Sequence, residues 1–191
     1  MSMRMPLVVL CVLAVALVAS AEQGGGDQMM MPTPPKEMAK LDAMVGTWKG
    51  TGTIYAMESP MKFDTVIKGA KRFQGQYLVQ EETLSTVMPP ATTPMVVHEE
   101  MRVTWYDTTA KTYRITSYDE TGTPMSGTCR FDGDKFIVEY ESLPFDPGQK
   151  YRAIGTAQGK DKLVVVGESS SDNWKTTTKV FDCTYQRAGG M

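Results

Sequence analysis

Histidine and concentrated positive charge are both scarce in this sequence of 191 residues. It contains a single histidine, His98, and its 20 basic residues are balanced by 22 acidic ones, which gives a formal net charge of −2. The lysines and arginines are spread along the chain, whereas nucleic acids and anionic membranes are bound through clustered basic residues. We therefore expect no nucleic-acid partner, and no membrane partner once the N-terminal leader described below is removed.

The scarcity of histidine also restricts catalysis. A serine or cysteine nucleophile would have one candidate base, and neither a Gly-x-Ser-x-Gly motif nor a histidine-containing metal spacing occurs. The adjacent pairs Glu81-Glu82 and Glu99-Glu100 would point to opposite faces of a strand, so neither pair can converge on one bond. We expect no catalytic residue, no metal and no cofactor, and we rank a hydrolase or isomerase low.

The first residues resemble a secretory signal. Arg4 is followed by an uncharged apolar run over residues 7–18 and by Ala19-Ser20-Ala21, a typical cleavage site. The run is shorter than the roughly 20 apolar residues that span a bilayer. We predict a signal peptide over residues 1–21, a disordered linker over residues 22–35, and export to the periplasm or the extracellular space.

Cysteine is rare as well, with three residues in the chain. Cys11 lies in the predicted leader, which leaves Cys129 and Cys183. In an oxidising compartment these two are candidates for a disulfide. The alternative is a pair of buried free thiols, which pack as small hydrophobic groups.

The rest of the chain has the alternation of an all-β domain. Apolar residues alternate with polar ones over residues 61–73, 101–106, 136–141 and 181–185, and Gly- and Asp-rich turns separate the runs. This predicts about ten strands in an antiparallel meander over residues 36–187, with a short helix over residues 36–44 before the first strand and a tail over residues 188–191. Such a sheet tends to close into a barrel, although a two-sheet sandwich is a rival.

Several short motifs resemble a known family. In order they are Gly46-Thr47-Trp48 with Gly50, residues 72–78 (RFQGQYL), Trp105-Tyr106-Asp107 with Tyr113, and a turn over residues 119–122 leading to Gly127. Together they resemble the bacterial domain-of-unknown-function family DUF1579, whose fold is a lipocalin-like, calycin-type barrel with a Gly-x-Trp opening motif. The resemblance implies that Gly46 and Trp48 close one end of the barrel, with Arg187 over the tryptophan ring.

A lipocalin-like barrel can hold a small molecule, which is our leading functional hypothesis. The alternation places Trp105, Tyr113, Phe136 and Tyr140 inside, with Glu99 and Arg114 near the mouth. These residues predict a small apolar or aromatic ligand. The alternatives are a packed barrel that serves as an envelope interaction or scaffold protein, and a haem-binding barrel using His98 or Tyr185. The haem-binding alternative is less favoured because the alternation places His98 on the wet face of its strand. The oligomeric state stays open.

Overall fold

The structure, a computed structural model, describes residues 32–56, 59–88, 90–140 and 148–189. The predicted signal peptide and most of the predicted linker lie outside the described residues. No helix among the described residues is long and apolar enough to cross a bilayer.

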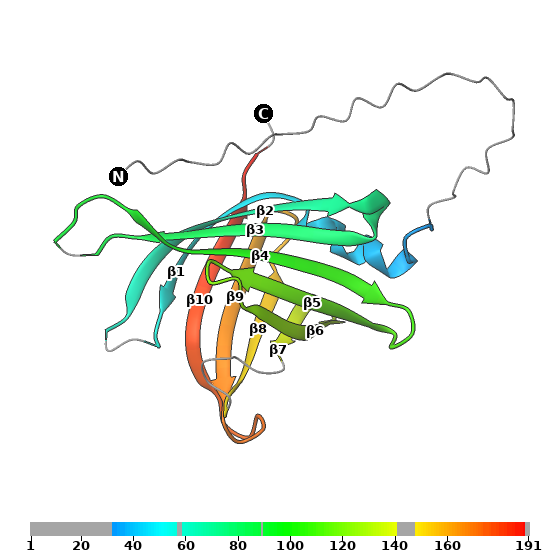
Figure 1. Cartoon of the computed structure of the whole chain (residues 1–191). Helices are drawn as coiled ribbons and strands as arrows, with labels where there is room; N and C mark the ends of the chain where they lie inside the picture. Colours follow the sequence, from blue (N-terminus) through cyan, green and yellow to red (C-terminus); the bar gives the residue numbers. More distant parts are fainter. Residues whose placement is uncertain (1–31, 57–58, 89, 141–147, 190–191) are drawn as a thin grey trace, which may run out of the picture. The chain divides into compact units, whose positions relative to one another are not determined.

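The domain is a ten-stranded barrel in which each strand pairs antiparallel with the next and β1 pairs with β10 (Figure 1). This confirms the predicted meander and excludes the sandwich. A 3-10 helix, η1 (Lys36–Met44), precedes the first strand as expected, and a single 3-10 turn, η2 (Phe73–Gly75), separates β2 from β3. The strands are β1 (Gly46–Ile54), β2 (Met61–Arg72), β3 (Tyr77–Thr86), β4 (Met95–Asp107), β5 (Thr112–Asp119), β6 (Pro124–Asp132), β7 (Lys135–Tyr140), β8 (Lys150–Ala157), β9 (Lys162–Ser170) and β10 (Thr178–Arg187).

Alternation of side chains along each strand determines which residues point into the barrel. In β2, Phe63, Thr65 and Ile67 are buried inside the barrel, while Lys62 and Lys68 are exposed on the outside. Because neighbouring strands are paired in register, the inward positions continue around the barrel from strand to strand. Trp48, for example, lies between Ile67 on β2 and Arg187 on β10.

One end of the barrel is closed by η1 and by the Trp48–Arg187 pair. The guanidinium of Arg187 lies 4.3 Å from the centre of the Trp48 ring, as expected from the sequence. Its two terminal nitrogens donate to the carbonyls of Val45 and Ala43, each at 2.6 Å. Gly46 has a φ of +107°, and a Cβ there would lie 3.1 Å from Nη1 of Arg187. The glycine therefore gives the chain both the left-handed turn and the close approach that this closure needs.

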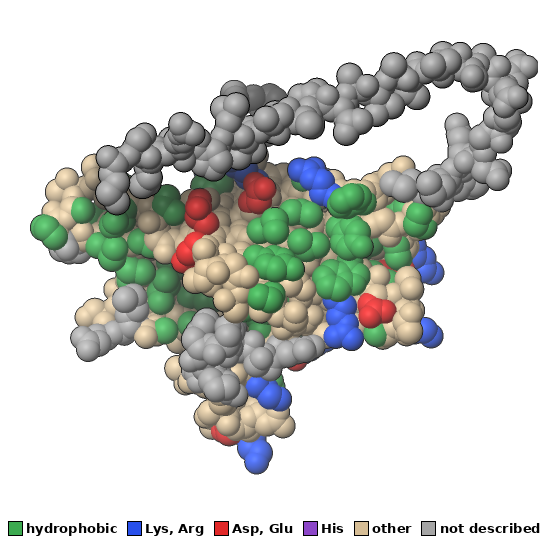
Figure 2. All heavy atoms as spheres, viewed as in Figure 1, with side chains coloured by type: hydrophobic (Ala, Val, Ile, Leu, Met, Phe, Trp, Pro, Cys, Tyr) green, Lys and Arg blue, Asp and Glu red, His purple; other side chains and the backbone are tan. Residues whose placement is uncertain are grey.

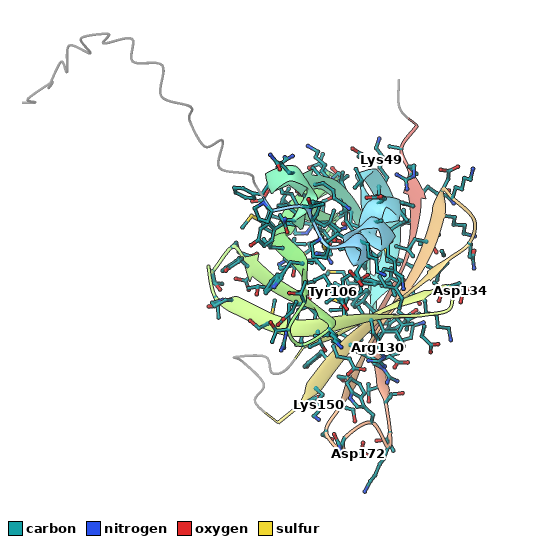
Figure 3. All side chains as sticks on the ribbon, turned by 90° about the vertical axis from the view of Figure 1, so that its right-hand side faces the viewer. Lys49, Tyr106, Arg130, Asp134, Lys150 and Asp172 are labelled. Atoms are coloured by element: carbon teal, nitrogen blue, oxygen red, sulfur yellow. The ribbon has the colours of Figure 1, made fainter. Side chains whose placement is uncertain are left out.

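The buried apolar residues form two clusters. The first lies beneath η1 and contains Met38, Leu41, Leu78, Tyr113, Ile115, Cys129 and Val138. The second lies along β1, β2 and β10 and contains Trp48, Phe63, Ile67, Cys183 and Tyr185. Figure 3 looks at the end that η1 covers, where Tyr106 lies beside the helix while Arg130 and Asp134 lie on the periphery. The closed end is thus the tightly packed part of the domain.

Replacing Arg187 tests how much the closure contributes. Arg187→Leu removes three hydrogen bonds from a charged donor, an ion pair with Asp161 and one cation–π contact, so we expect the free energy of unfolding to fall by about 2–3 kcal/mol. Gln186→Leu, at the neighbouring exposed position, is the matched control and should change it by less than about 0.5 kcal/mol. Urea unfolding followed by circular dichroism measures both; equal effects would contradict the role assigned to Arg187.

Candidate functional site: a polar cluster inside the barrel

Charged and polar side chains meet inside the barrel, on the mouth side of the closed end. The charged members are Glu82 on β3 and Glu100 and Arg102 on β4. They share the inward face because Glu82 pairs with both Ile67 and Glu100, and Arg102 pairs with Ser117. Hydroxyl groups surround them, contributed by Thr65, Ser117, Tyr140 and Tyr185 from β2, β5, β7 and β10.

Glu82 is the centre of the hydrogen-bond network. Its carboxylate is paired with Nη2 of Arg102, and its Oε1 accepts from the hydroxyl of Thr65 at 2.7 Å and from that of Tyr185 at 3.1 Å. Tyr185 belongs to β10, which β1 and β2 separate from β3 around the barrel. The last of these bonds therefore crosses the lumen. The network ties four strands together through side chains rather than through the sheet.

Two polar atoms in the cluster lack a hydrogen bond of ordinary geometry within the described residues. They are Nε of Arg102 and Oγ of Ser117, and both are buried. Nε lies 3.7 Å from Oε2 of Glu100, and the fully buried Ser117 side chain lies beside the hydroxyl of Tyr140. Arg102 and Ser117 are direct cross-strand partners, so the two atoms belong to one wall of the lumen. Unsatisfied buried polar atoms are rare and usually mark the place of a water, an ion or a ligand.

The network sets the charge states of the cluster. Burial by itself would raise the pKa of Glu82, but the guanidinium of Arg102 and the hydrogen bonds from Thr65 and Tyr185 outweigh it, and the pKa is lowered. Burial raises the pKa of Tyr140 and of Tyr185 well above the usual range, so both phenols stay neutral. In this cluster the carboxyl groups of Glu82 and Glu100 face a single guanidinium, that of Arg102.

Two hollows lie on the mouth side of the closed end. One of about 420 Å³ follows β3, β4 and the end of β5; most of its lining, including Glu81, Glu99 and Tyr118, belongs to the outer face, and Glu82 and Glu100 border it. A larger groove of about 1180 Å³ lies between the ends of β1 and β2 and the β3–β4 turn. The Arg102 side chain retains 20% of its exposure, so the lumen is not filled above it.

Three of the predicted lining residues do face inward. Tyr140 lies in the polar cluster within electrostatic range of Arg102 and Glu100. Tyr113 and Phe136 belong instead to the packed closed end. The hydroxyl of Tyr113 donates to the carbonyl of Glu37 in η1 at 2.7 Å, and the ring of Phe136 lies 4.9 Å from that of Phe131. Of the three, Tyr140 is the one placed to meet a ligand.

The other three predicted lining residues face outward, which corrects the prediction. Trp105 pairs with Arg114 on the outer face of the barrel, next to Tyr77 at a ring distance of 6.4 Å. Arg114 lies 3.7 Å from Asp107 there, far along β5 from the mouth. Glu99 is exposed on the same outer face, although it borders the 420 Å³ pocket. The error has a physical cause: in β4, Glu100 and Arg102 face the inside of the barrel while Met101, Val103 and Trp105 face the outside, opposite to the usual pattern.

The same reversal corrects the prediction for His98. The sequence suggested that it lies on the wet face, but it shares the inward face with Glu100 and Arg102 because it pairs with Leu84. Its position near the start of β4 places it at the mouth, with Nδ1 3.0 Å from Oε2 of Glu120. No group of three or more His, Cys, Asp or Glu side chains in the described part of the chain is placed to hold a metal ion.

The predicted disulfide is absent. Cys129 and Cys183 are both buried free thiols, which is the alternative that the sequence left open. Cys129 packs in the cluster beneath η1, whereas Cys183 belongs to the β1–β2–β10 cluster. Each side chain fills a space inside the barrel in the manner of a small hydrophobic residue.

Comparison with known proteins shows the class of fold. No protein-family model matches the chain, and no curated protein matches it, so the resemblance to DUF1579 stays a prediction. Among solved structures, Rv2717c from M. tuberculosis matches with a TM-score of 0.59 at 14% identity, over 82% of this chain and 99% of that one. The S-type phycobiliprotein lyase CPES from Guillardia theta matches with a TM-score of 0.54 at 10% identity, over 80% of this chain and 93% of that one. The domain therefore shares the fold of these two proteins, a closed lipocalin-like β-barrel.

Sequence reasoning missed Glu82, Arg102 and Ser117. Charged residues in a strand normally indicate the side that faces solvent. When each strand is considered alone, an inward face with two glutamates and an arginine is therefore assigned to the outside of the barrel. The available signal was charge pairing between strands: an arginine on one strand can neutralise a glutamate on the next only if both lie on the same face.

The lowered pKa of Glu82 predicts how stability depends on pH. A carboxylate whose pKa is lower in the folded state contributes stability above its unfolded pKa, near 4.5, and that contribution is lost as the pH falls through the folded pKa. We expect the free energy of unfolding to fall as the pH drops below the unfolded value of 4.5. In Glu82→Gln this part of the decline should disappear, even though the variant is less stable at pH 7. Urea unfolding at several pH values measures both; an unchanged acid slope in the variant would contradict the assignment.

Because both cysteines are free thiols, the stability of the domain should not depend on reductant. Burial raises the pKa of both Cys129 and Cys183 to about 12, so almost no thiolate is present at neutral pH. We expect dithiothreitol to leave the melting temperature unchanged. Both thiols should react with Ellman's reagent only after denaturation. A melting temperature that falls by several degrees on reduction would show that a disulfide forms after all.

Proposed function

We propose that this chain is a binding protein that holds a small, uncharged, amphipathic molecule in the lumen of its barrel. The observation that carries the proposal is the pair of unsatisfied buried atoms, Nε of Arg102 and Oγ of Ser117, on one wall of the lumen. Both can donate a hydrogen bond, and one carbonyl or hydroxyl oxygen of a ligand could accept from both.

The charge of the site argues against an anion. The lumen already contains two carboxylates for one guanidinium, and Glu120 and Asp119 stand at the mouth beside His98. A carboxylate or phosphate would enter against this charge, whereas an uncharged oxygen would not. This refines the apolar or aromatic ligand expected from the sequence by adding a polar group with an accepting oxygen.

The apolar part of the ligand would lie against the inner wall on the mouth side. Phe63 and Leu84 pack along the second core cluster next to Thr65 and Glu82. Met61 and Phe181 retain part of their exposure at the ends of β2 and β10. A closed barrel of this size suits one small ligand, which the likeness in fold to other lipocalin-like barrels also supports.

A fluorescent probe that matches this chemistry tests the proposal. Prodan is flat and uncharged, carries one ketone oxygen, and changes its emission when it leaves water and when the ketone accepts a hydrogen bond. We expect saturable uptake with a blue shift. Arg102→Lys keeps the positive charge beside Glu82 but removes Nε, and it should raise the Kd about tenfold, which is the value of one hydrogen bond to a charged donor.

Arg130→Lys is the matched control because Arg130 is an exposed arginine on the outside of the barrel, paired with Glu139. It should leave the prodan Kd unchanged. Anilinonaphthalene sulfonate, a flat anion, should bind more weakly than prodan. Absence of saturable prodan binding, or equal affinity in Arg102→Lys and the wild type, would contradict the proposed site.

A further inference from the structure

The outer face of β3, β4 and β5 carries an apolar surface that the lumen does not use. It consists of Phe73, Tyr77, Val79, Met101, Val103, Trp105 and Tyr118, which we call the aromatic face. Of these, Phe73 is 70% exposed, Met101 41%, Tyr118 38% and Tyr77 37%. Figure 2 shows hydrophobic side chains gathered over these strands. Aromatic residues and methionine are enriched at the cores of protein interfaces.

The edge of this face is held in a costly conformation. Phe73 has a φ of +50°, a left-handed value that bulky residues rarely adopt, and Gln74 follows it at +56°. This turn holds the Phe73 ring in solvent, edge-on to Tyr77 at 5.8 Å. Strained backbone of this kind clusters at functional sites, and here it presents a ring that stays 70% exposed.

The two ends of the aromatic face carry opposite charges, with basic residues at the closed end of the barrel and acidic residues at the mouth end. Arg72 pairs with Tyr77 at the closed end of the barrel, and Arg114, which also lies near Asp107, pairs with Trp105 there. At the mouth end, Glu99 lies beyond Met101 on β4, and Glu120 lies beyond Tyr118 at the end of β5. In Figure 2 the acidic side chains lie mainly to the left of the apolar patch and the basic ones mainly above and to its right.

We infer that the aromatic face is the interface of a two-fold symmetric dimer of this chain. A two-fold axis perpendicular to the face would lay the aromatic residues of both copies together and place the basic end of each against the acidic end of the other. The described strands form a closed barrel with no free sheet edge, so two copies cannot associate by pairing edge strands. A partner of one sign of charge would match only one end, whereas a second copy matches both.

Sedimentation velocity over a concentration series tests the inference on the purified full chain. We expect the wild type to form dimers at micromolar concentrations. Phe73→Ser should raise the dimer Kd at least about tenfold without lowering the melting temperature, because the ring is mostly exposed in the monomer. Val87→Ser is the matched control: Val87 is 47% exposed but lies on the β3–β4 connection outside the aromatic face, so the Kd should not change.

Charge reversal tests the orientation of the two copies. Arg72→Glu and Glu99→Lys should each weaken the dimer, and the double variant Arg72→Glu/Glu99→Lys should recover much of the loss because opposite charges again face each other. A wild type that stays monomeric up to about 100 µM would overturn the inference. A dimer that is indifferent to Phe73→Ser, or a double variant no better than either single one, would overturn it as well.

Discussion

The structure depends on the pairing of β1 with β10, which closes the sheet. Without it the inward face of ten strands would be an open apolar surface; with it the same face becomes an interior with one sealed end. The seal is local and specific, since Arg187 at the end of β10 reaches over Trp48 near the start of β1 and binds the carbonyls of Val45 and Ala43. Everything else inside the barrel is arranged relative to that end.

Closure also explains why charged groups are tolerated inside. Beneath η1 the interior is dry and packed with aromatic and aliphatic side chains, and an ion there would have no partner. Toward the mouth, Glu82 has Arg102, Thr65 and Tyr185 as partners, and removing Arg102 would leave a buried carboxylate without its counter-charge. The network is nearly complete, and the two atoms that it leaves free, on Arg102 and Ser117, are where an external molecule would be recognised.

The sequence predicted the architecture well because its signals are local and redundant. Alternation in β2, β7 and β10 identified both the strands and their inner faces, and the helix before β1 was placed correctly. The site was predicted poorly because its signal is not local. Tyr140 was identified from the alternation in β7, but Glu82, Arg102 and Ser117 are recognisable only once the register of three strands is known.

The strand that misled the prediction borders both the polar cluster in the lumen and the aromatic face outside. In β4 the polar residues Glu100, Arg102 and Thr104 face the lumen and the apolar residues Met101, Val103 and Trp105 face outward. For a strand in a monomeric barrel with a packed core, this orientation would be unfavourable on both sides: charges would be desolvated inside, and aromatic surface would be wetted outside. Local pattern and tertiary structure disagree in this way mainly at sites selected for function. A ligand that completes the inner network and a second copy that covers the outer face would each remove one of the two costs, so the reversal of this single strand is most simply explained if both surfaces are occupied.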